Sequence, residues 1–328
     1  MQKIDFVVPW VDGNDPSWQK KKRQFCPEDP GQNIRYRDWD TLKYWFRGVD
    51  KNAPWVNRII LITDRQIPEW LNLKNPKLRL VDHTDYIPAE YLPTFSTHTI
   101  ELNLHRISCL SDKFVYFNDD IFVMKPVTEE DFFKKGLPVD MAVLYPGITT
   151  KDQVFDHILL ENADFFARHY DIRKVIAKNR LKWHHPVYGK SVLKTLAMEQ
   201  FPDFTGIMMH HQPNSYLKST LVKAWELEPE LLDRVSRNRV RAKDDVNQYI
   251  FRYIQLGEGL FEPVNLFKRG AMLKLGEKSL DYDLLFANNK YKLLCLNDEA
   301  DMIDYQEEKQ KLVQAMDNIF HQKSSFEK

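Results

Sequence analysis

The chain has 328 residues, 43% of them hydrophobic and 29% charged, and its 47 acidic residues balance its 47 basic ones. This length suits one large domain or two small ones, and the formal net charge of zero argues against non-specific nucleic-acid binding, which needs a basic surface. No apolar stretch approaches the roughly 18 residues of a membrane span. The first residues, MQKIDFVVPW, lack the pattern of a signal peptide. We therefore expect a cytoplasmic protein.

The first third of the chain alternates between strand and helix patterns. Short apolar runs predict strands over 4–8, 58–63 and 78–81. Between the first two, Asp40 can cap a helix whose apolar residues recur at helical spacing, namely Leu42, Trp45, Phe46 and Val49. Strands and helices that alternate in this way indicate an α/β fold with a mainly parallel sheet.

The loop after the first predicted strand reads Trp10-Val11-Asp12-Gly13. A carboxylate, an aromatic face and a glycine that allows close backbone approach suit a nucleotide at that place, and a tight turn is the alternative. The chain has no glycine-rich phosphate-binding fingerprint. Any phosphate must therefore be held by Arg, Lys or a metal ion.

A second helix is predicted over 96–110. Within it Glu101 and His105 are four residues apart and share a face, with His98 one turn earlier and Arg106 beside them. These side chains form either an exposed salt-bridged face or part of a site. The choice depends on whether they face the ligand-binding edge of the sheet.

The segment FVYFNDDIFV, residues 114–123, places Asp119 and Asp120 inside a run that otherwise has the composition of a buried strand. Burying an ionised carboxylate is costly unless a cation or hydrogen-bond donors meet it. Asn118 interrupts the apolar run, so the acids follow the carboxyl end of a strand, where ligands bind in open α/β sheets. A turn that uses these side chains for its own backbone hydrogen bonds is the alternative.

The rest of the chain is expected to be mainly helical over 141–260, followed by short strands and a charged terminal helix over 261–328. The helical part contains two histidine pairs, His184-His185 before Pro186 and His210-His211. A histidine in either pair can act as an acid or base near neutral pH. Arg241 precedes a helix and is free to meet an anion.

These motifs together resemble the Stealth family of sugar-phosphate transferases, bacterial capsule enzymes related to the animal N-acetylglucosamine-1-phosphate transferase. The resemblance covers nearly the whole chain in four ordered blocks: residues 4–15; 52–120, ending in Tyr116-Phe-Asn-Asp-Asp120; His184-His185-Pro186 with Val240-Arg241; and 294–298. The residues after Pro186 depart from the animal enzyme, and its large insertions are absent.

The resemblance implies one catalytic unit, with a Rossmann-like, GT-A-like nucleotide-sugar-binding core over 1–140, that transfers a hexose-1-phosphate to a sugar hydroxyl. The family's catalytic residues match Glu101, Asp120, His184 and Arg241, with His185 as the alternative to His184. The other expected substrate-binding residues are Trp10, Val11, Asp12, Gly13, His105, Arg106 and Asn118.

On this hypothesis Asp120, assisted by Asp119 or Asn118, binds Mg²⁺ or Mn²⁺ on the donor pyrophosphate. Arg241 neutralises the phosphates, with Arg106 as a further candidate, and His184 accepts the proton of the acceptor hydroxyl. Glu101 orients His184 or the donor.

The expected partners are a UDP-sugar donor and a glycan acceptor, which a lipid can carry. Two alternatives remain: an ordinary glycosyltransferase that releases the nucleoside diphosphate, and a non-catalytic binding protein of capsule assembly. Basic runs at 20–23 and 168–182 are either solvated faces or a weak attraction to an anionic membrane surface at the inner face of the cell membrane.

Overall fold

The structure is a computed structural model that describes residues 3–27, 36–147, 154–275, 280–298 and 304–328. Its strands are β1 (Ile4–Pro9), β2 (Arg58–Thr63), β3 (Leu78–Asp82), β4 (Lys113–Tyr116), β5 (Ile121–Val123), β6 (Phe133–Lys134), β7 (Leu137–Asp140), β8 (Asn214–Leu217), β9 (Glu262–Pro263), β10 (Gly270–Lys274) and β11 (Leu293–Asn297).

The α-helices are α1 (Pro16–Phe25), α2 (Leu42–Asn52), α3 (Thr97–Leu102), α4 (Val154–His169), α5 (Ile172–Lys178), α6 (Arg180–Trp183), α7 (Val192–Met198), α8 (Lys218–Leu227), α9 (Pro229–Ser236), α10 (Tyr249–Glu258), α11 (Leu266–Arg269), α12 (Tyr282–Ala287) and α13 (Tyr305–Ile319). Two short 3₁₀ helices matter below, η4 (Leu104–Arg106) and η6 (Pro186–Ser191). None of the helices in these ranges is long and apolar enough to cross a membrane.

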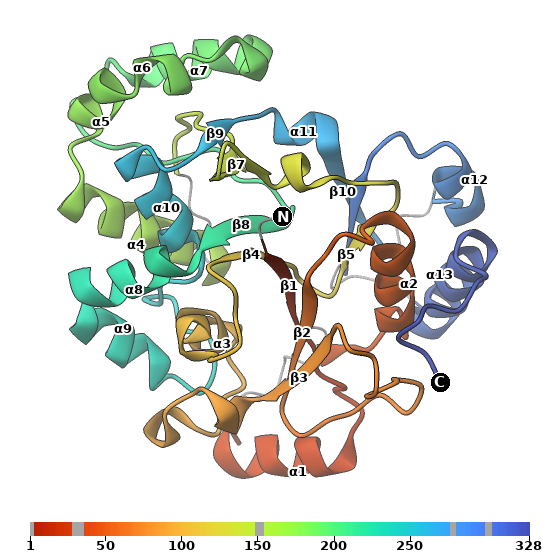
Figure 1. The fold of residues 1–328 in the computed structure, drawn as a ribbon. Helices are drawn as coiled ribbons and strands as arrows, with labels where there is room; N and C mark the ends of the chain where they lie inside the picture. Colours follow the sequence, from red (N-terminus) through yellow and green to blue (C-terminus); the bar gives the residue numbers. More distant parts are fainter. Residues whose placement is uncertain (1–2, 28–35, 148–153, 276–279, 299–303) are drawn as a thin grey trace.

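The main sheet has the strand order β3-β2-β1-β4-β8 (Figure 1). The first four strands are parallel to their neighbours, and β8 is antiparallel to β4. The predicted α/β class and mainly parallel sheet are therefore confirmed. Strand β8 lies in the part expected to be helical. Its four residues carry little pattern of their own, and pairing with the distant β4 makes them a strand.

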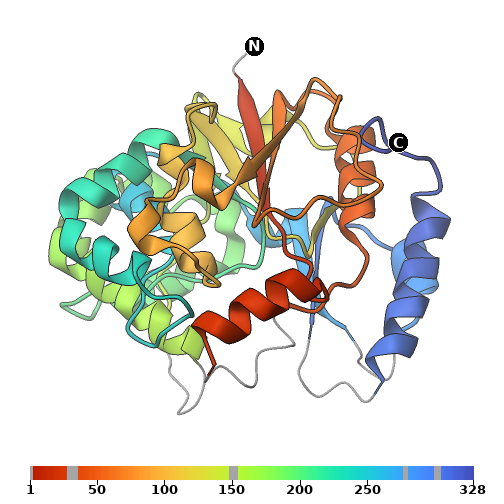
Figure 2. The ribbon, with the colours of Figure 1, turned by 90° about the horizontal axis from the view of Figure 1, so that it is seen from below.

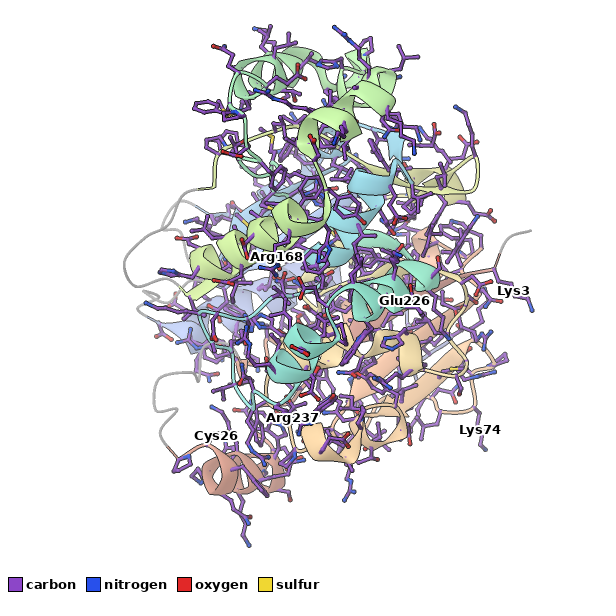
Figure 3. All side chains as sticks on the ribbon, turned by 90° about the vertical axis from the view of Figure 1, so that its left-hand side faces the viewer. Lys3, Cys26, Lys74, Arg168, Glu226 and Arg237 are labelled. Atoms are coloured by element: carbon purple, nitrogen blue, oxygen red, sulfur yellow. The ribbon has the colours of Figure 1, made fainter. Side chains whose placement is uncertain are left out.

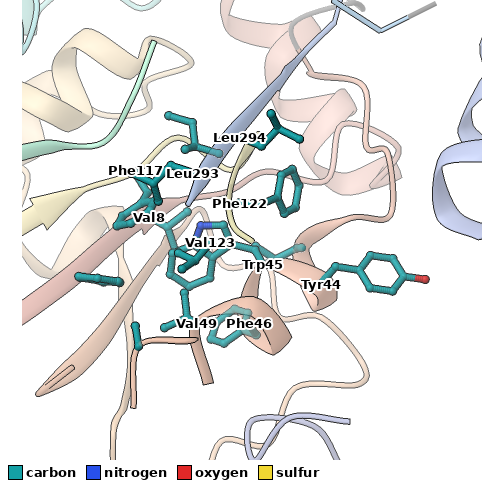
Figure 4. Close-up of a cluster of buried hydrophobic side chains, with 14 of the residues drawn as sticks. Val8, Tyr44, Trp45, Phe46, Val49, Phe117, Phe122, Val123, Leu293 and Leu294 are labelled. Atoms are coloured by element: carbon teal, nitrogen blue, oxygen red, sulfur yellow. The ribbon is translucent and has the colours of Figure 1, made fainter. Parts of the chain in front are cut away.

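Helices cover both faces of this sheet, because successive side chains of a strand point to opposite faces. On one side Val8 packs in a core with Trp45 of α2 (Figure 4), and Phe6 and residues of α13 belong to the same core. On the other side Val7 belongs to a core that α3, α8, α9 and α10 complete. Figures 1 and 2 show these two groups of helices to the right and left of the sheet.

A second sheet joins the carboxyl-terminal part of the chain to the core. Strand β5, which follows the acid pair, is antiparallel to β11, and β11 is parallel to β10. The terminal segment also contacts α2, where Arg47 is paired with Glu327 at 2.7 Å. The acid pair is thus held between a strand of the main sheet and a strand of the second sheet.

The helix predicted over 96–110 is shorter than expected. It ends at Leu102, and the chain continues through Asn103 into the 3₁₀ helix η4. The side chain of Asn103 donates to the carbonyl of Thr99 and to Ser236 Oγ, a local competition with the helix that Asn favours. The predicted common face of Glu101 and His105 is therefore wrong, because the two residues belong to different helices.

The helix predicted after Asp40 is present, but its cap differs by one residue. Helix α2 begins at Leu42 with Thr41 in the cap position, while Asp40 has a positive φ of 56°. The part expected to be mainly helical contains α4 to α10, and the charged helix predicted at the end of the chain is present as α13.

Candidate active site

The candidate site lies where the strand order of the main sheet reverses. The chain leaves β1 towards β2 on one side, whereas β4 lies on the other side. Such a switch point leaves a crevice at the carboxyl ends of the strands, where ligands bind in α/β proteins. Trp10 and Val11 follow β1 there, and Asn118, Asp119 and Asp120 follow β4; all five line a cavity of about 450 Å³.

Helix α3 and the segment before α10 supply the facing wall of this cavity. Its lining includes His98 and Glu101 from α3, and Arg241, Gln248 and Tyr249 from the second segment. The packing of α10 and its neighbours on the sheet brings together residues that are more than 100 positions apart in the sequence. The structure therefore places Glu101, Asp120 and Arg241 around one cavity.

A second cavity of about 280 Å³ adjoins the first. The residues that line both cavities are Trp10, Asp119, Asp120, Arg241 and Asn297. Its other polar residues include Asp38 and Asp298, and Asp298 accepts hydrogen bonds from Trp39 Nε1 at 3.1 Å and Arg37 Nη1 at 3.4 Å. The acid pair and Arg241 therefore stand at the junction of two spaces.

Asp120 has an unusual environment for a carboxylate. Its Oδ2 accepts a hydrogen bond from the Cys295 thiol at 3.4 Å, whereas its Oδ1 is buried and has no hydrogen-bond partner in the described part of the chain. Such an atom is costly to bury unless a donor or a cation meets it. The turn is closed by Ile121 N–H donating to the Asn118 carbonyl at 3.2 Å, so the carboxyl groups are not needed for it.

The three acids at this junction are all less acidic than usual. Asp119 lines both cavities, and partial loss of hydration there, together with the nearby Asp120 and Asp38, raises its pKa to about 7. Burial raises the pKa of Asp120 to about 6, against the lowering effect of the Cys295 hydrogen bond. Burial also raises the pKa of Asp38 to about 6. Concentrated carboxylates of this kind favour a bound cation.

The acid pair fits a divalent metal ion that is shared with a substrate. Across the described ranges, no group of three or more His, Cys, Asp or Glu side chains is arranged to hold a metal ion alone. Asp119 and Asp120 offer two carboxylates, one with the unpartnered oxygen. Mg²⁺ is often bound by one or two carboxylates together with substrate phosphates and water, so this donor set suits it.

Glu101 is buried and fully hydrogen-bonded. Its Oε1 accepts from the Tyr116 hydroxyl at 3.0 Å and from Gln248 Nε2 at 3.2 Å, and its Oε2 accepts from the Gln248 backbone N–H. Burial raises its pKa, while His98 and Arg241 act against that rise. Glu101 thus ties α3 to β4 and to the start of α10, and it contributes negative charge to the cavity wall.

His98 is held by a buried carboxylate that the sequence reasoning did not assign to the site. His98 Nδ1 is 2.8 Å from Asp245 Oδ2, and both side chains are buried. Asp245 also accepts hydrogen bonds from Asn238 Nδ2 and the Ala242 N–H. The carboxylate fixes the ring orientation, so that Nε2, which makes no hydrogen bond to any described residue, is the nitrogen left for the cavity.

Arg241 is available for an anion. Its Nε and Nη2 donate to Thr97 Oγ1, at 3.1 and 2.6 Å, and within the described residues no carboxylate forms an ion pair with it. Thr97 opens α3, so the hydrogen bonds position the guanidinium beside Glu101 and the acid pair. A planar guanidinium in this place matches phosphate oxygens.

The structure does not bring His184 to this cavity. His184 follows α6, and its Nε2 lies 2.6 Å from Glu199 Oε1 in a separate cavity of about 250 Å³. Its neighbour His185 caps η6 by accepting a hydrogen bond from the Val187 N–H. The histidine that lines the main cavity besides His98 and His83 is His211.

His211 has the properties of a proton acceptor. Its ring is 6.3 Å from the Phe155 ring, and within the described segments no hydrogen bond holds it. Although the residue is exposed, loss of water around its ring lowers the pKa of His211, which favours the neutral imidazole. The sequence contained this residue in its second histidine pair, but no spacing rule distinguished that pair from the first.

Four expected substrate-binding residues lie outside the lining of the cavity. The Arg106 guanidinium stacks 5.0 Å from the Trp225 ring centre, and burial near that ring lowers the pKa of His105 to about 4. Asp12 accepts from the Asn14 N–H within its own turn. A Cβ on Gly13 would lie 1.9 Å from the Tyr36 carbonyl, so the glycine is required by the chain itself.

Comparison with known proteins identifies the family. Residues 2–25 match the model "Stealth protein CR1, conserved region 1", and residues 35–139 match "Stealth protein CR2, conserved region 2". The chain is 37% identical over 334 residues to a capsular polysaccharide phosphotransferase WcwK of Streptococcus pneumoniae, covering 100% of this chain and 99% of that protein. The chain belongs to the Stealth family.

Other relatives agree with this membership. A receptor polysaccharide phosphotransferase WefC of Streptococcus gordonii is 39% identical, with 100% of this chain and 99% of that protein covered. An exopolysaccharide phosphotransferase of Lactiplantibacillus plantarum is 36% identical, covering 99% and 96%. The resemblance expected from the four sequence blocks is confirmed, and the chain is an enzyme of the phosphotransferase class.

Solved glycosyltransferase structures are distant from this Stealth protein. A structure of the bifunctional glycosyltransferase WbbM aligns with a TM-score of 0.43 and 12% identity, covering 97% of this chain and 50% of that one. LgtC aligns with a TM-score of 0.42 and 12% identity, covering 95% of each chain. Scores of this size carry no argument about substrate or mechanism.

Proposed function

We propose that this Stealth protein transfers a hexose-1-phosphate from a UDP-sugar to a hydroxyl of a glycan acceptor, forming a phosphodiester and releasing UMP, in the synthesis of a capsular or other cell-surface polysaccharide. The observation that carries the proposal is the acid pair with its unpartnered oxygen, which stands with Arg241 at the junction of two cavities. When an acceptor hydroxyl attacks a donor phosphorus, groups that neutralise phosphate charge must lie where the two substrates meet.

The larger cavity suits the donor. It lies at the switch point of the sheet, and Trp10 and Val11 after β1 line it. The donor pyrophosphate would then reach the acid pair, and the acceptor would enter from the smaller cavity beside Asp38 and Asp298. The acceptor is a glycan, carried by a lipid at the inner face of the cell membrane.

Asp120 and Asp119 would hold Mg²⁺ or Mn²⁺ against the pyrophosphate oxygens, with Asn118 beside them. When bound, the ion neutralises negative charge on the phosphates. Arg241 contacts the same phosphates by hydrogen bonds that its link to Thr97 orients. Glu101 holds α3, β4 and α10 in the register that keeps these groups together.

In the transfer step the acceptor oxygen attacks the sugar-linked phosphorus. The new O–P bond forms as the bond from that phosphorus to the bridging oxygen breaks, and the electron pair leaves with UMP. The acceptor proton passes to a histidine of the cavity wall. His211 is the first candidate because its lowered pKa favours the neutral ring, which is not held by other described residues. His98 is the second, because Asp245 orients it.

Product analysis tests the proposal. The protein is incubated with a panel of UDP-sugars, an acceptor glycan and Mg²⁺ or Mn²⁺, and the nucleotide and glycan products are separated. We expect UMP and a phosphodiester signal in the phosphorus NMR spectrum of the glycan. Stoichiometric release of UDP with a phosphorus-free glycan would instead establish an ordinary glycosyltransferase and overturn the proposal.

A further inference from the structure

The helices α5 to α7 form an arm that carries a concentrated positive charge. Between residues 172 and 201 the sequence has seven Lys or Arg residues and one acidic residue, Glu199, although the whole chain has no formal net charge. The arm lies at the top of Figure 1 and of Figure 3, beyond the end of the main sheet. A charge asymmetry of this size is typical of a surface that meets a polyanion.

Four basic side chains of the arm are exposed and have no ion-pair partner among the described residues, whereas Lys174 Nζ lies 3.3 Å from Asp171 Oδ2. The four are Arg173, Lys178, Arg180 and Lys190. Lys182 differs, because it donates to the carbonyls of Gly259 and Phe261 and so attaches the arm to the body of the protein. The unpaired positive charges therefore lie on an arm that is attached to the body of the protein.

Large apolar side chains are exposed on the same arm. Leu181 in α6 is 87% exposed, Leu193 and Leu196 in α7 are 65% and 47% exposed, and Phe201 just after α7 is 52% exposed. Leu193 and Leu196 are three residues apart and share one face of their helix. Exposed leucines among unpaired lysines and arginines are the composition of interfacial amphipathic segments.

We propose that the arm of residues 172–201 docks on an anionic lipid bilayer. Its leucines and Phe201 enter the boundary between headgroups and acyl chains, and its lysines and arginines contact anionic headgroups. The inference deepens the proposed function, since a lipid-linked acceptor lies in that same membrane. The docking itself is independent of which bond the enzyme breaks.

Two other occupants fit the arm less well. A nucleic-acid backbone would leave the exposed leucines without an apolar environment. A second copy of the chain would bring like charges together, which disfavours association. An anionic bilayer satisfies both the charge and the apolar side chains.

Sedimentation with vesicles tests the proposal. The full-length protein is mixed with vesicles of phosphatidylcholine containing 30% phosphatidylglycerol, and with vesicles of phosphatidylcholine alone. We expect binding to the anionic vesicles that weakens with salt, and little binding to the neutral ones. The triple variant Lys178→Gln, Lys190→Gln and Lys194→Gln should bind about 100-fold more weakly, since each basic side chain contributes roughly fivefold at an anionic surface.

Matched variants separate the arm from general surface properties. Lys74→Gln, Lys268→Gln and Lys290→Gln remove the same charge from other exposed positions outside both basic runs and should bind as the unchanged protein does. Leu181→Gln with Leu193→Gln should weaken binding, whereas Leu73→Gln with Val222→Gln, also exposed, should not.

The outcomes are distinguishable from those of the proposed function. Absence of vesicle binding, equal losses in the arm and control variants, or arm-dependent self-association without lipid would each overturn the docking surface. Arm variants should keep normal turnover with a soluble acceptor. If the protein binds vesicles but releases UDP, the docking surface is supported and the proposed reaction is wrong.

Discussion

At the scale of single residues, Asp120 decides whether the acid pair is a metal site. The side chain is half-buried, and its Oδ1 is itself buried and has no hydrogen-bond partner among the described residues. Asp120→Asn keeps the shape of the side chain and removes its charge. We expect turnover to fall by about 10²- to 10³-fold, the usual range for one group that stabilises transition-state charge. The melting temperature should stay the same or rise, because a buried charge has been removed.

Turnover and thermal stability must be measured on the same variants to separate loss of the metal ion from loss of the fold. Steady-state turnover and thermal unfolding are recorded for Asp120→Asn and for Asp119→Asn, whose side chain faces the cavity and which should lose less activity. A folded Asp120→Asn protein with normal turnover would show that the pair does not hold a metal ion.

The raised pKa values of the acids predict a dependence of stability on pH. A carboxyl group whose pKa is higher in the folded state contributes stability at low pH, and this contribution is lost as the pH rises through the folded value. For Asp38 and Asp120 that value is about 6, and for Asp119 about 7. The metal-free protein should therefore lose part of its stability between about pH 4, near the ordinary pKa of an Asp carboxyl group, and about pH 7, with little further change above that.

Magnesium ions should counteract this loss. Because Mg²⁺ binds the ionised carboxylates, its addition should raise the melting temperature more at pH 8 than at pH 5.5. The comparison is made by calorimetry on the unchanged protein and on Asp119→Asn with Asp120→Asn. An equal Mg²⁺ effect in both proteins would place the ion elsewhere.

The proton acceptor is tested by three histidine variants. His211→Gln should reduce turnover by about 10²- to 10⁴-fold, the range for loss of a general base, and should flatten the acidic limb of the pH–rate profile. His184→Gln, remote from the main cavity, should keep normal turnover. If His98→Gln alone flattens that limb, the histidine oriented by Asp245 is the base instead.

At the scale of elements, the packing of α2 on β5 holds the acid turn in place. Gly48 of α2 approaches β5 so closely that a Cβ would lie 2.8 Å from the Val123 carbonyl oxygen. Gly48→Ala gains about 1 kcal/mol of helix propensity, but the helix or the strand must move. We expect a net loss of roughly 1–2 kcal/mol in the free energy of unfolding.

Denaturant unfolding measures this loss. The exposed Lys51→Ala in the same helix is the control and should be close to neutral. Because β5 follows Asp120 directly, Gly48→Ala should also weaken activation by Mg²⁺. A variant as stable as the unchanged protein would mean that α2 can move without cost.

At the scale of the whole molecule, the last residues attach to the first third of the chain. Phe326 is buried, and its ring centre is 5.2 Å from that of Phe46. Phe326→Ala should lower the free energy of unfolding by about 3–5 kcal/mol and leave turnover at low temperature unchanged, since Phe326 lines neither cavity. Phe267→Ala, at a residue that is 45% exposed, should have little effect.

Melting curves and turnover at low temperature check this prediction together. Loss of turnover in a folded Phe326→Ala protein would show that the carboxyl-terminal contact shapes the site as well as stabilising the fold.

The sequence by itself determined the elements whose signal is local. The apolar runs of β1, β2, β3 and β4 and the helical spacing in α2 predict their own structure, because burial of one face depends on neighbouring residues. The acid pair after β4 was also predictable, since two carboxylates in an apolar run demand a partner. Glu101, Asp120 and Arg241 came from the family resemblance, and the structure places them around one cavity.

The tertiary structure alone decided what depends on distant contacts. Helix α3 ends after Leu102 because Asn103 forms hydrogen bonds that include one to Ser236. Strand β8 forms because it pairs with β4, which lies far from it in the sequence. Which histidine reaches the cavity follows from how the arm and α10 pack, so His211 and not His184 lies there. Local patterns cannot contain this information, because a side chain's position relative to a site is fixed by the packing of elements far apart in sequence.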